Sequence, residues 1–176
     1  AARNQARRNL DLRFFETGMV YIPAAEDMLA TQPAEVDTLA MLVAGAPDEG
    51  WLQKDGAYDY FTLKGVMDHI FDTLGLAFEY RRTTRPFLHP GRTAALLLNG
   101  EEIGYLGEIH PKVAENYQLT GRVIVAELAL PAVMAAALAL GNKDHDLPKY
   151  PASTRDIAVI GSSDIAESQV AAVIRN

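Results

Sequence analysis

The stretch that decides the fold runs from Phe87 to Val113 and reads FLHPGRTAALLLNGEEIGYLGEIHPKV. Asn99-Gly100 separates two apolar runs of strand length. This pair is favoured where both central residues of a tight hairpin turn need positive φ. The stretch therefore predicts a β-hairpin around which the rest of the chain is arranged.

The outgoing strand of this hairpin predicts a polar site. By the two-residue period, Glu108 and His110 share a face with Gly104 and Leu106, whereas Ile103, Tyr105, Gly107 and Ile109 share the other. A carboxylate and an imidazole beside a glycine resemble the floor of a pocket. A His-Pro pair stands at each outer end of the hairpin and marks where a strand begins or ends, because proline cannot donate to a sheet ladder.

Two interpretations of these side chains stay open. His89, Glu108 and His110 could bind zinc or iron, with Glu16, Arg81, Arg82 and Arg92 as helpers, which would suit a metal-dependent hydrolase. Alternatively, each histidine caps its strand beside a proline, and Glu108 is bound by a backbone amide or by Arg92.

Composition narrows the class of protein. The chain has 176 residues, of which 49% are hydrophobic, enough for a packed core in a soluble, globular chain. The lack of cysteine excludes disulfides, zinc–thiolate sites and cysteine nucleophiles, and favours the cytosol. No apolar run approaches the roughly 20 residues of a membrane span. The net charge of −7 argues against a whole surface that binds nucleic acid, and the first residues resemble the middle of a longer protein.

Hydrophobic periodicity predicts the remaining elements before residue 143. Strands are expected at residues 12–22, 36–44, 78–83 and 123–130, and helices at 1–10, 60–74, 111–117 and 131–140. Polar loops are expected at 23–33 and at 48–59, which holds the only tryptophan, Trp51. Gly75 stands where a C-terminal helix cap is favoured.

Residues 143–151 predict a domain boundary, because they are charged, contain two prolines and lack an apolar period. Beyond them, a strand is expected at 155–160 and an amphipathic helix at 165–174. One strand and one helix cannot close a core, so the second domain is expected to be cut short.

Five stretches together resemble the β subunit of bacterial phenylalanine–tRNA ligases. They are FFETGMVY at 14–21, DYFTLKG at 59–65, LHPGRTA at 88–94, IGYLGEIHP at 103–111 and YPASTRDIA at 150–158. They cover nearly the whole chain in the family's order. The resemblance implies an α+β fold in which residues 1–146 form an inactive, catalytic-like domain with a class II aminoacyl-tRNA synthetase-like antiparallel sheet and flanking helices. Residues 147–176 would be the first strand and helix of a truncated ferredoxin-like anticodon-binding domain.

The same resemblance speaks against catalysis by this chain. In the related catalytic α subunit, the strand that corresponds to 14–22 carries an arginine for ATP and the amino acid, whereas this chain reads VYIP at 20–23. The glycine-rich strand that leads to a second arginine is replaced by VIVAEL at 123–128, which contains Glu127. No catalytic, cofactor-binding or metal-binding residue is expected. The framework of the vestigial pocket would be Glu16, His89, Arg92, Glu108 and His110.

The resemblance also implies partners. The chain would support the synthetase α subunit in an assembly of two α and two β chains, located in the cytoplasm and away from membranes, with Mg²⁺ and ATP used by the parent complex. The basic residues Arg3, Arg7 and Arg8 and the acidic segment 24–59 are candidate contact surfaces. Arg155 would meet tRNA(Phe), unless it only pairs with Asp156. A regulatory domain that binds a small ligand in the pocket is a third possibility.

Overall fold

The computed structural model describes residues 1–23, 32–47, 56–141, 149–151, 153–162 and 165–175. The chain divides into two compact units, Ala1–Asn142 and Lys143–Asn176. The roles expected of residues 1–146 and 147–176 stay predictions. Trp51 and most of the loops expected at 23–33 and 48–59 lie outside the described residues.

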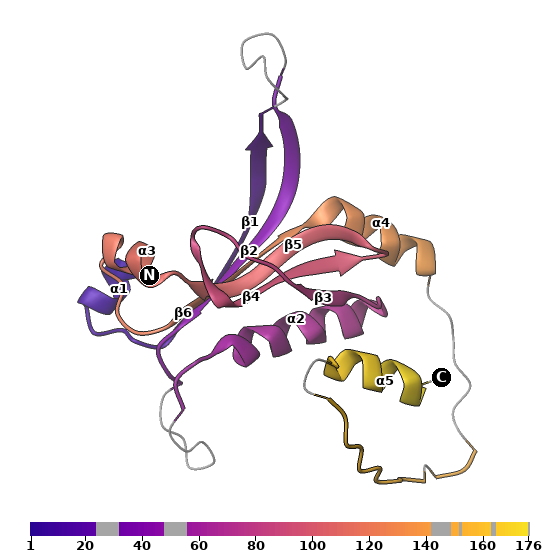
Figure 1. The fold of residues 1–176 in the computed structure, drawn as a ribbon. Helices are drawn as coiled ribbons and strands as arrows, with labels where there is room; N and C mark the ends of the chain where they lie inside the picture. Colours follow the sequence, from indigo (N-terminus) through magenta and orange to yellow (C-terminus); the bar gives the residue numbers. More distant parts are fainter. Residues whose placement is uncertain (24–31, 48–55, 142–148, 152, 163–164, 176) are drawn as a thin grey trace. The chain divides into compact units, whose positions relative to one another are not determined.

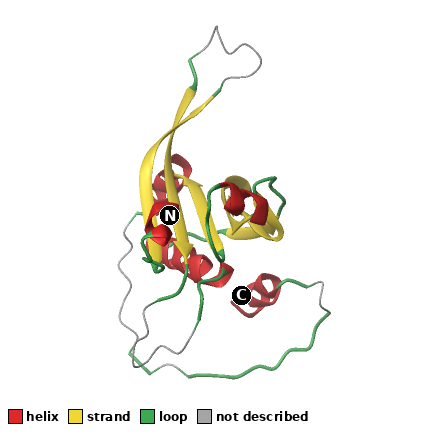
Figure 2. Cartoon of the chain, turned by 90° about the vertical axis from the view of Figure 1, so that its left-hand side faces the viewer, coloured by secondary structure: helices red, strands yellow, loops and turns green. Residues whose placement is uncertain are grey.

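The first unit is built on one six-stranded antiparallel sheet, with strand order β1-β2-β6-β5-β4-β3 (Figures 1 and 2). The strands are β1 (Leu12–Ile22), β2 (Ala34–Ala44), β3 (Glu79–Arg82), β4 (Leu88–Leu98), β5 (Glu101–Ile109) and β6 (Val123–Ala129). The predicted α+β class and antiparallel sheet are therefore confirmed. No described helix has the length and apolar character needed to span a membrane.

The central hairpin is formed by β4 and β5, as predicted. Asn99 has φ 53° and Gly100 has φ 84°, so both central residues adopt the left-handed conformation that this turn requires. The register shifts from Leu96 opposite Gly104 to Leu97 opposite Glu102, which leaves Ile103 as the extra residue of a β-bulge. The prediction that Ile103 shares a face with Tyr105 is wrong, because the bulge turns Ile103 into the core.

Five helices complete the described elements: α1 (Ala2–Ala6), α2 (Tyr60–Leu74), α3 (Pro111–Asn116), α4 (Leu130–Leu140) and α5 (Glu167–Arg175). The start of α2 is specified by a capping box, in which the Asp59 carboxylate accepts from the Thr62 N–H at 2.9 Å and the Thr62 hydroxyl accepts from the Asp59 N–H. Gly75 ends the helix at φ 67°. Helix α2 is thus bounded where the sequence predicts.

The main core lies between one face of the sheet and helices α2 and α4. Its members include Phe71 from α2, Val133 from α4, and Leu96, Leu106 and Ile124 from the sheet. Phe71 is fully buried and stacks on Phe78, with ring centroids 4.0 Å apart. Because the helices cover one face, alternate side chains of β1, β2, β5 and β6 point to the other, which we call the open face.

The second unit corrects a prediction. Residues 153–160 form neither helix nor strand, although a strand was predicted at 155–160. The side chains of Ile157, Val159 and Ile160 are exposed. A strand is stabilised by a neighbouring ladder, and the described residues of this unit supply none. The predicted helix is present as α5, beginning two residues later than expected.

Candidate functional site

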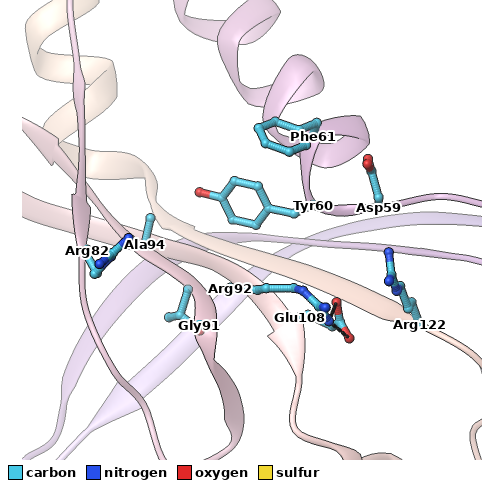
Figure 3. Close-up of a pocket in the computed structure, with 10 residues that line it drawn as sticks. Asp59, Tyr60, Phe61, Arg82, Gly91, Arg92, Ala94, Glu108 and Arg122 are labelled. Atoms are coloured by element: carbon cyan, nitrogen blue, oxygen red, sulfur yellow. Dashed lines mark hydrogen bonds and ion pairs between the residues drawn. The ribbon is translucent and has the colours of Figure 1, made fainter. Parts of the chain in front are cut away.

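Two cavities lie on opposite faces of the sheet. The helix-side pocket, of about 380 Å³, is lined by Asp59, Tyr60, Phe61, Arg82, Gly91, Arg92, Thr93, Ala94, Glu108 and Arg122 (Figure 3). The open-face pocket, of about 450 Å³, is lined by Phe14, Phe15, Glu16, Ala40, Met41, Leu42, Phe87, Tyr105, Ile109, Val125, Ala126 and Glu127. The pleat separates them, because Glu108 and Tyr105 are three positions apart on β5.

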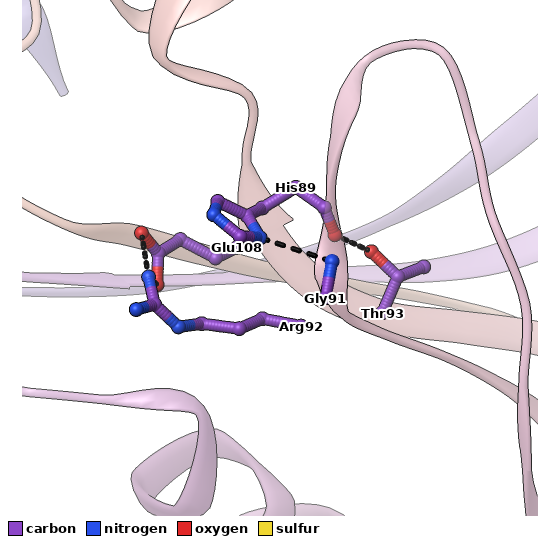
Figure 4. Close-up of polar contacts among 5 residues, drawn as sticks. All are labelled: His89, Gly91, Arg92, Thr93 and Glu108. Carbon is purple, nitrogen blue, oxygen red and sulfur yellow. Dashed lines mark hydrogen bonds and ion pairs between the residues drawn. The ribbon is translucent and has the colours of Figure 1, made fainter.

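An ion pair closes the floor of the helix-side pocket. Nη1 of Arg92 donates to both carboxylate oxygens of Glu108, at 3.0 and 2.9 Å (Figure 4). Glu108 is buried, with 7% of its surface exposed, whereas the side chain of Arg92 is 41% exposed. The Glu108 carboxylate is thus already paired with a cation from within the chain.

The two histidines are engaged in local backbone contacts. Nδ1 of His89 accepts from the Gly91 N–H at 3.1 Å (Figure 4), and Nδ1 of His110 accepts from the Lys112 N–H at 3.2 Å, capping α3. Among the described residues, no group of three or more His, Asp or Glu side chains is placed to hold a metal ion. The metal-dependent hydrolase gains no support from this arrangement.

The five predicted framework residues do not form one site. Arg92 and Glu108 line the helix-side pocket, Glu16 lines the open-face pocket, and His89 and His110 line neither. The alternation of β1 is as predicted, because its ladder with β2 runs from Leu12 to Ile22 without a register shift.

The structure brings together only some of the expected basic helpers. Arg81 and Arg85 both reach Glu102, at 3.7 and 2.5 Å, and Arg85 lies over the Tyr105 ring, 4.6 Å from its centroid. Arg82 lines the helix-side pocket instead. Of the three expected helpers, Arg82 and Arg92 therefore share the helix-side pocket, and Arg81 lies apart from them at Glu102.

The open-face pocket contains a tyrosine–glutamate pair that the sequence reasoning missed. Tyr105 donates its hydroxyl to Glu127 Oε2 at 3.1 Å, across the register that places the two residues opposite each other. Burial, followed by the charge and hydrogen bond of Glu127, raises the pKa of Tyr105 to about 12, although Arg85 opposes the shift. Only the strand order could reveal this pair, because 22 positions separate its members.

The lining of the open-face pocket is acidic. Its described lining contains the carboxylates of Glu16 and Glu127, several aromatic rings, and no lysine or arginine. Apolar walls strengthen electrostatic effects, so these carboxylates disfavour a triphosphate there.

The Tyr105–Glu127 pair should make the stability of the fold depend on pH in the alkaline range. Between about pH 10 and about pH 12, the unfolded chain releases a tyrosine proton that folded Tyr105 retains. The stabilisation of the folded state that results from this pKa difference is fully present below pH 10. It is lost as pH rises towards 12. We expect the free energy of unfolding, measured with urea, to fall over this window. The slope should become shallower in Tyr105→Phe, and an unchanged slope would contradict the pair.

Removal of Arg92 should destabilise the fold. Arg92→Ala leaves the buried Glu108 carboxylate without its partner, so we expect the free energy of unfolding to fall by about 1–3 kcal/mol. Arg81→Ala is the matched control, because Arg81 is exposed and 3.7 Å from its acid, and should cost about 0–0.5 kcal/mol. Urea denaturation of both variants checks this, and Glu108→Gln should restore part of the loss in Arg92→Ala. Equal losses for the two arginines would show that the Glu108 pair has no special structural role.

Comparison with known proteins extends the resemblance seen in the sequence. A family model described as the phenylalanyl tRNA synthetase beta chain CLM domain matches residues 1–130. The phenylalanine–tRNA ligase beta subunit of Symbiobacterium thermophilum is 40% identical over 173 residues, 98% of this chain and 19% of that protein. The corresponding subunit of Staphylococcus haemolyticus is 38% identical over 176 residues (99% and 21%), and that of Listeria monocytogenes serovar 1/2a is 36% identical over 182 residues (99% and 22%).

The match covers most of this chain but only part of its relatives. The chain spans about a fifth of the length of the curated relatives it matches. The family model, in contrast, extends from the first residue through β6. The chain therefore belongs to the family of the phenylalanyl-tRNA synthetase beta chain CLM domain.

Proposed function

We propose that this chain is a non-catalytic part of a phenylalanine–tRNA ligase β subunit. It scaffolds the catalytic α subunit and contributes to tRNA(Phe) binding in the ATP-dependent phenylalanylation of tRNA. Residues 1–146 act as an inactive class II synthetase-like core, and residues 147–176 begin a ferredoxin-like anticodon-binding domain. Support comes from the family match and from the six-stranded antiparallel sheet with its helix-covered face.

The charge of the open-face pocket carries the proposal. Formation of an aminoacyl adenylate brings a triphosphate and a carboxylate together, and the chemistry needs cationic groups where that charge accumulates. The described lining of the open-face pocket offers Glu16 and Glu127 instead. In place of an ATP site, this face of the sheet presents an acidic and aromatic lining.

The proposal also assigns roles to the α subunit and to the contact between this chain and tRNA. In an assembly of two α and two β chains located in the cytoplasm, the α subunit binds Mg²⁺ and ATP. This chain contributes Arg155 to the tRNA contact, where it would meet phosphate. Arg155 Nη1 donates to the Ser153 hydroxyl and to the Thr154 carbonyl oxygen, the latter at 3.1 Å. Among the described residues no ion pair joins Arg155 to Asp156, which leaves the guanidinium's charge available to an anion.

Two assays with the purified chain test the proposal. Phenylalanine-dependent exchange of pyrophosphate into ATP should be absent for the chain alone, and sedimentation of a mixture with the α subunit should show a complex of the two. Exchange or tRNA charging by the chain without α would overturn the non-catalytic role. Failure of the folded chain to bind α would overturn the scaffold role.

A further inference from the structure

Two glutamates of the open-face pocket stand at the ends of one row that crosses the sheet. Glu16 on β1 is opposite Ala40 on β2, and Ala40 is opposite Glu127 on β6. Residues opposite each other in a ladder share a face, so the two glutamates rise from the same face with their Cα atoms about 10 Å apart. The small side chain of Ala40 leaves a hollow between them, which is part of the pocket of about 450 Å³.

Both carboxylates lack a cationic partner. Glu127 is held at its end of the row, because its Oε2 accepts from the Tyr105 hydroxyl at 3.1 Å on the side away from β1. Glu16 is exposed, and among the described residues no ion pair reaches either glutamate. The described lining of the pocket contains no lysine or arginine. The two negative charges are therefore unbalanced within the pocket.

The surface around these charges is aromatic and apolar. Phe14 lies two positions before Glu16 and therefore shares the open face. Phe87 meets Tyr105 edge to face, with ring centroids 5.5 Å apart and an angle of 71° between the planes. Val125, which is partly buried, adds to the apolar floor. A pocket with negative ends and an apolar middle is complementary to a ligand with positive ends and an apolar middle.

The chain itself places one cation against these rings. The guanidinium carbon of Arg85 lies 4.6 Å from the centroid of the Tyr105 ring, in a cation–π contact. Arg85 also pairs with Glu102, outside the pocket, so its charge is already used. The rings thus accept a cation, while the charge of the pocket itself stays uncompensated.

We propose that the open-face pocket binds a linear organic dication of the alkyl diamine class. One ammonium group pairs with Glu16 and the other with Glu127, and the methylene chain lies over Ala40 beside the aromatic rings. The spacing of the glutamates suits two separate charges better than one. Among the described residues, no three His, Asp or Glu side chains converge to hold a metal ion.

Isothermal titration calorimetry of the full chain with cadaverine, a five-carbon diamine, tests the proposal. Cadaverine should bind saturably, with one molecule per chain. Pentylamine has the same carbon chain but one charge, and it should bind at least about fivefold more weakly. Pentanediol, which has the same chain and no charge, should not bind. The measurement uses the chain without the α subunit, so its outcome is independent of the scaffold role.

Glutamine variants locate the two charges. Glu16→Gln and Glu127→Gln each remove one charge at nearly constant shape, so each should raise the dissociation constant of cadaverine at least about fivefold. Glu127→Gln keeps an oxygen that can accept from Tyr105, and circular dichroism would confirm that each variant is folded. Glu101→Gln is the matched control, because it removes the same charge from an exposed residue outside the pocket. It should leave the dissociation constant unchanged.

Phe87→Leu tests the aromatic wall. It keeps an apolar side chain but removes the ring, so cadaverine should bind about two- to fivefold more weakly. Absence of saturable cadaverine binding, equal affinities for cadaverine and pentylamine, or a folded Glu16→Gln or Glu127→Gln variant that binds as tightly as the unaltered chain would each overturn the proposal. Equal weakening in Glu101→Gln would also overturn it, because the diamine would then respond only to the overall negative charge of the chain.

Discussion

Replacement of Phe71 by alanine is expected to lower the free energy of unfolding of the sheet-containing unit by about 3–5 kcal/mol. Phe71 is fully buried on α2 and stacks on Phe78 at 4.0 Å with an angle of 18° between the ring planes. Truncation removes apolar contacts and leaves a cavity between the helix and the sheet. Urea denaturation followed by circular dichroism measures the loss.

Phe61→Ala is the control for this prediction. Phe61 lies on the same helix and has the same chemistry, but its side chain is 71% exposed at the helix-side pocket. Its removal should change the free energy of unfolding by no more than about 0.5 kcal/mol. If the two alanine variants lose the same stability, then α2 does not pack through the face that contains Phe71.

Gly104→Ala is expected to cost at least about 3 kcal/mol or to prevent folding. A Cβ at this position would lie 2.1 Å from the carbonyl oxygen of Glu127 on β6. That oxygen belongs to backbone, so the clash can be relieved only by parting β5 from β6, whose ladder pairs Gly104 with Leu128. Thermal and urea denaturation would both report the loss.

Gly65→Ala is expected to have the opposite effect on stability to Gly104→Ala. Gly65 lies within α2, and a Cβ there meets nothing within 4 Å. Because alanine favours the helix over glycine, this change should raise the free energy of unfolding by about 0.5–1 kcal/mol. A tolerated Gly104→Ala would contradict the close approach of β5 and β6, whatever the effect at Gly65.

Local signals allowed much of the fold to be predicted from the sequence. Asn99-Gly100 specifies the central turn, Gly75 ends α2, and Pro111 begins α3, and the structure confirms each of them. These signals succeed because positive φ and helix capping depend on residues close together in the chain. The alternation along β1 was likewise readable, because the two-residue period belongs to the strand itself.

Features that depend on distant residues were not predictable. The bulge at Ile103 arises from how β5 pairs with β4, and a bulge reverses the faces predicted from alternation. The Tyr105–Glu127 pair requires β5 and β6 to be neighbours. Residues 155–160 have a strand composition but no ladder among the described residues. For the same reason, Glu16 and Glu108 seemed to belong to one pocket, although the sheet places them on opposite faces.

Isothermal titration calorimetry of the folded chain with ATP in the presence of Mg²⁺ tests the central claim, that the chain is non-catalytic, most directly. The acidic lining of the open-face pocket predicts no saturable binding at millimolar nucleotide, with Glu16 and Glu127 disfavouring the triphosphate. Saturable binding that weakens in Phe87→Ala, within the open-face pocket, would show that this face still accepts the nucleotide. That result would contradict the non-catalytic account.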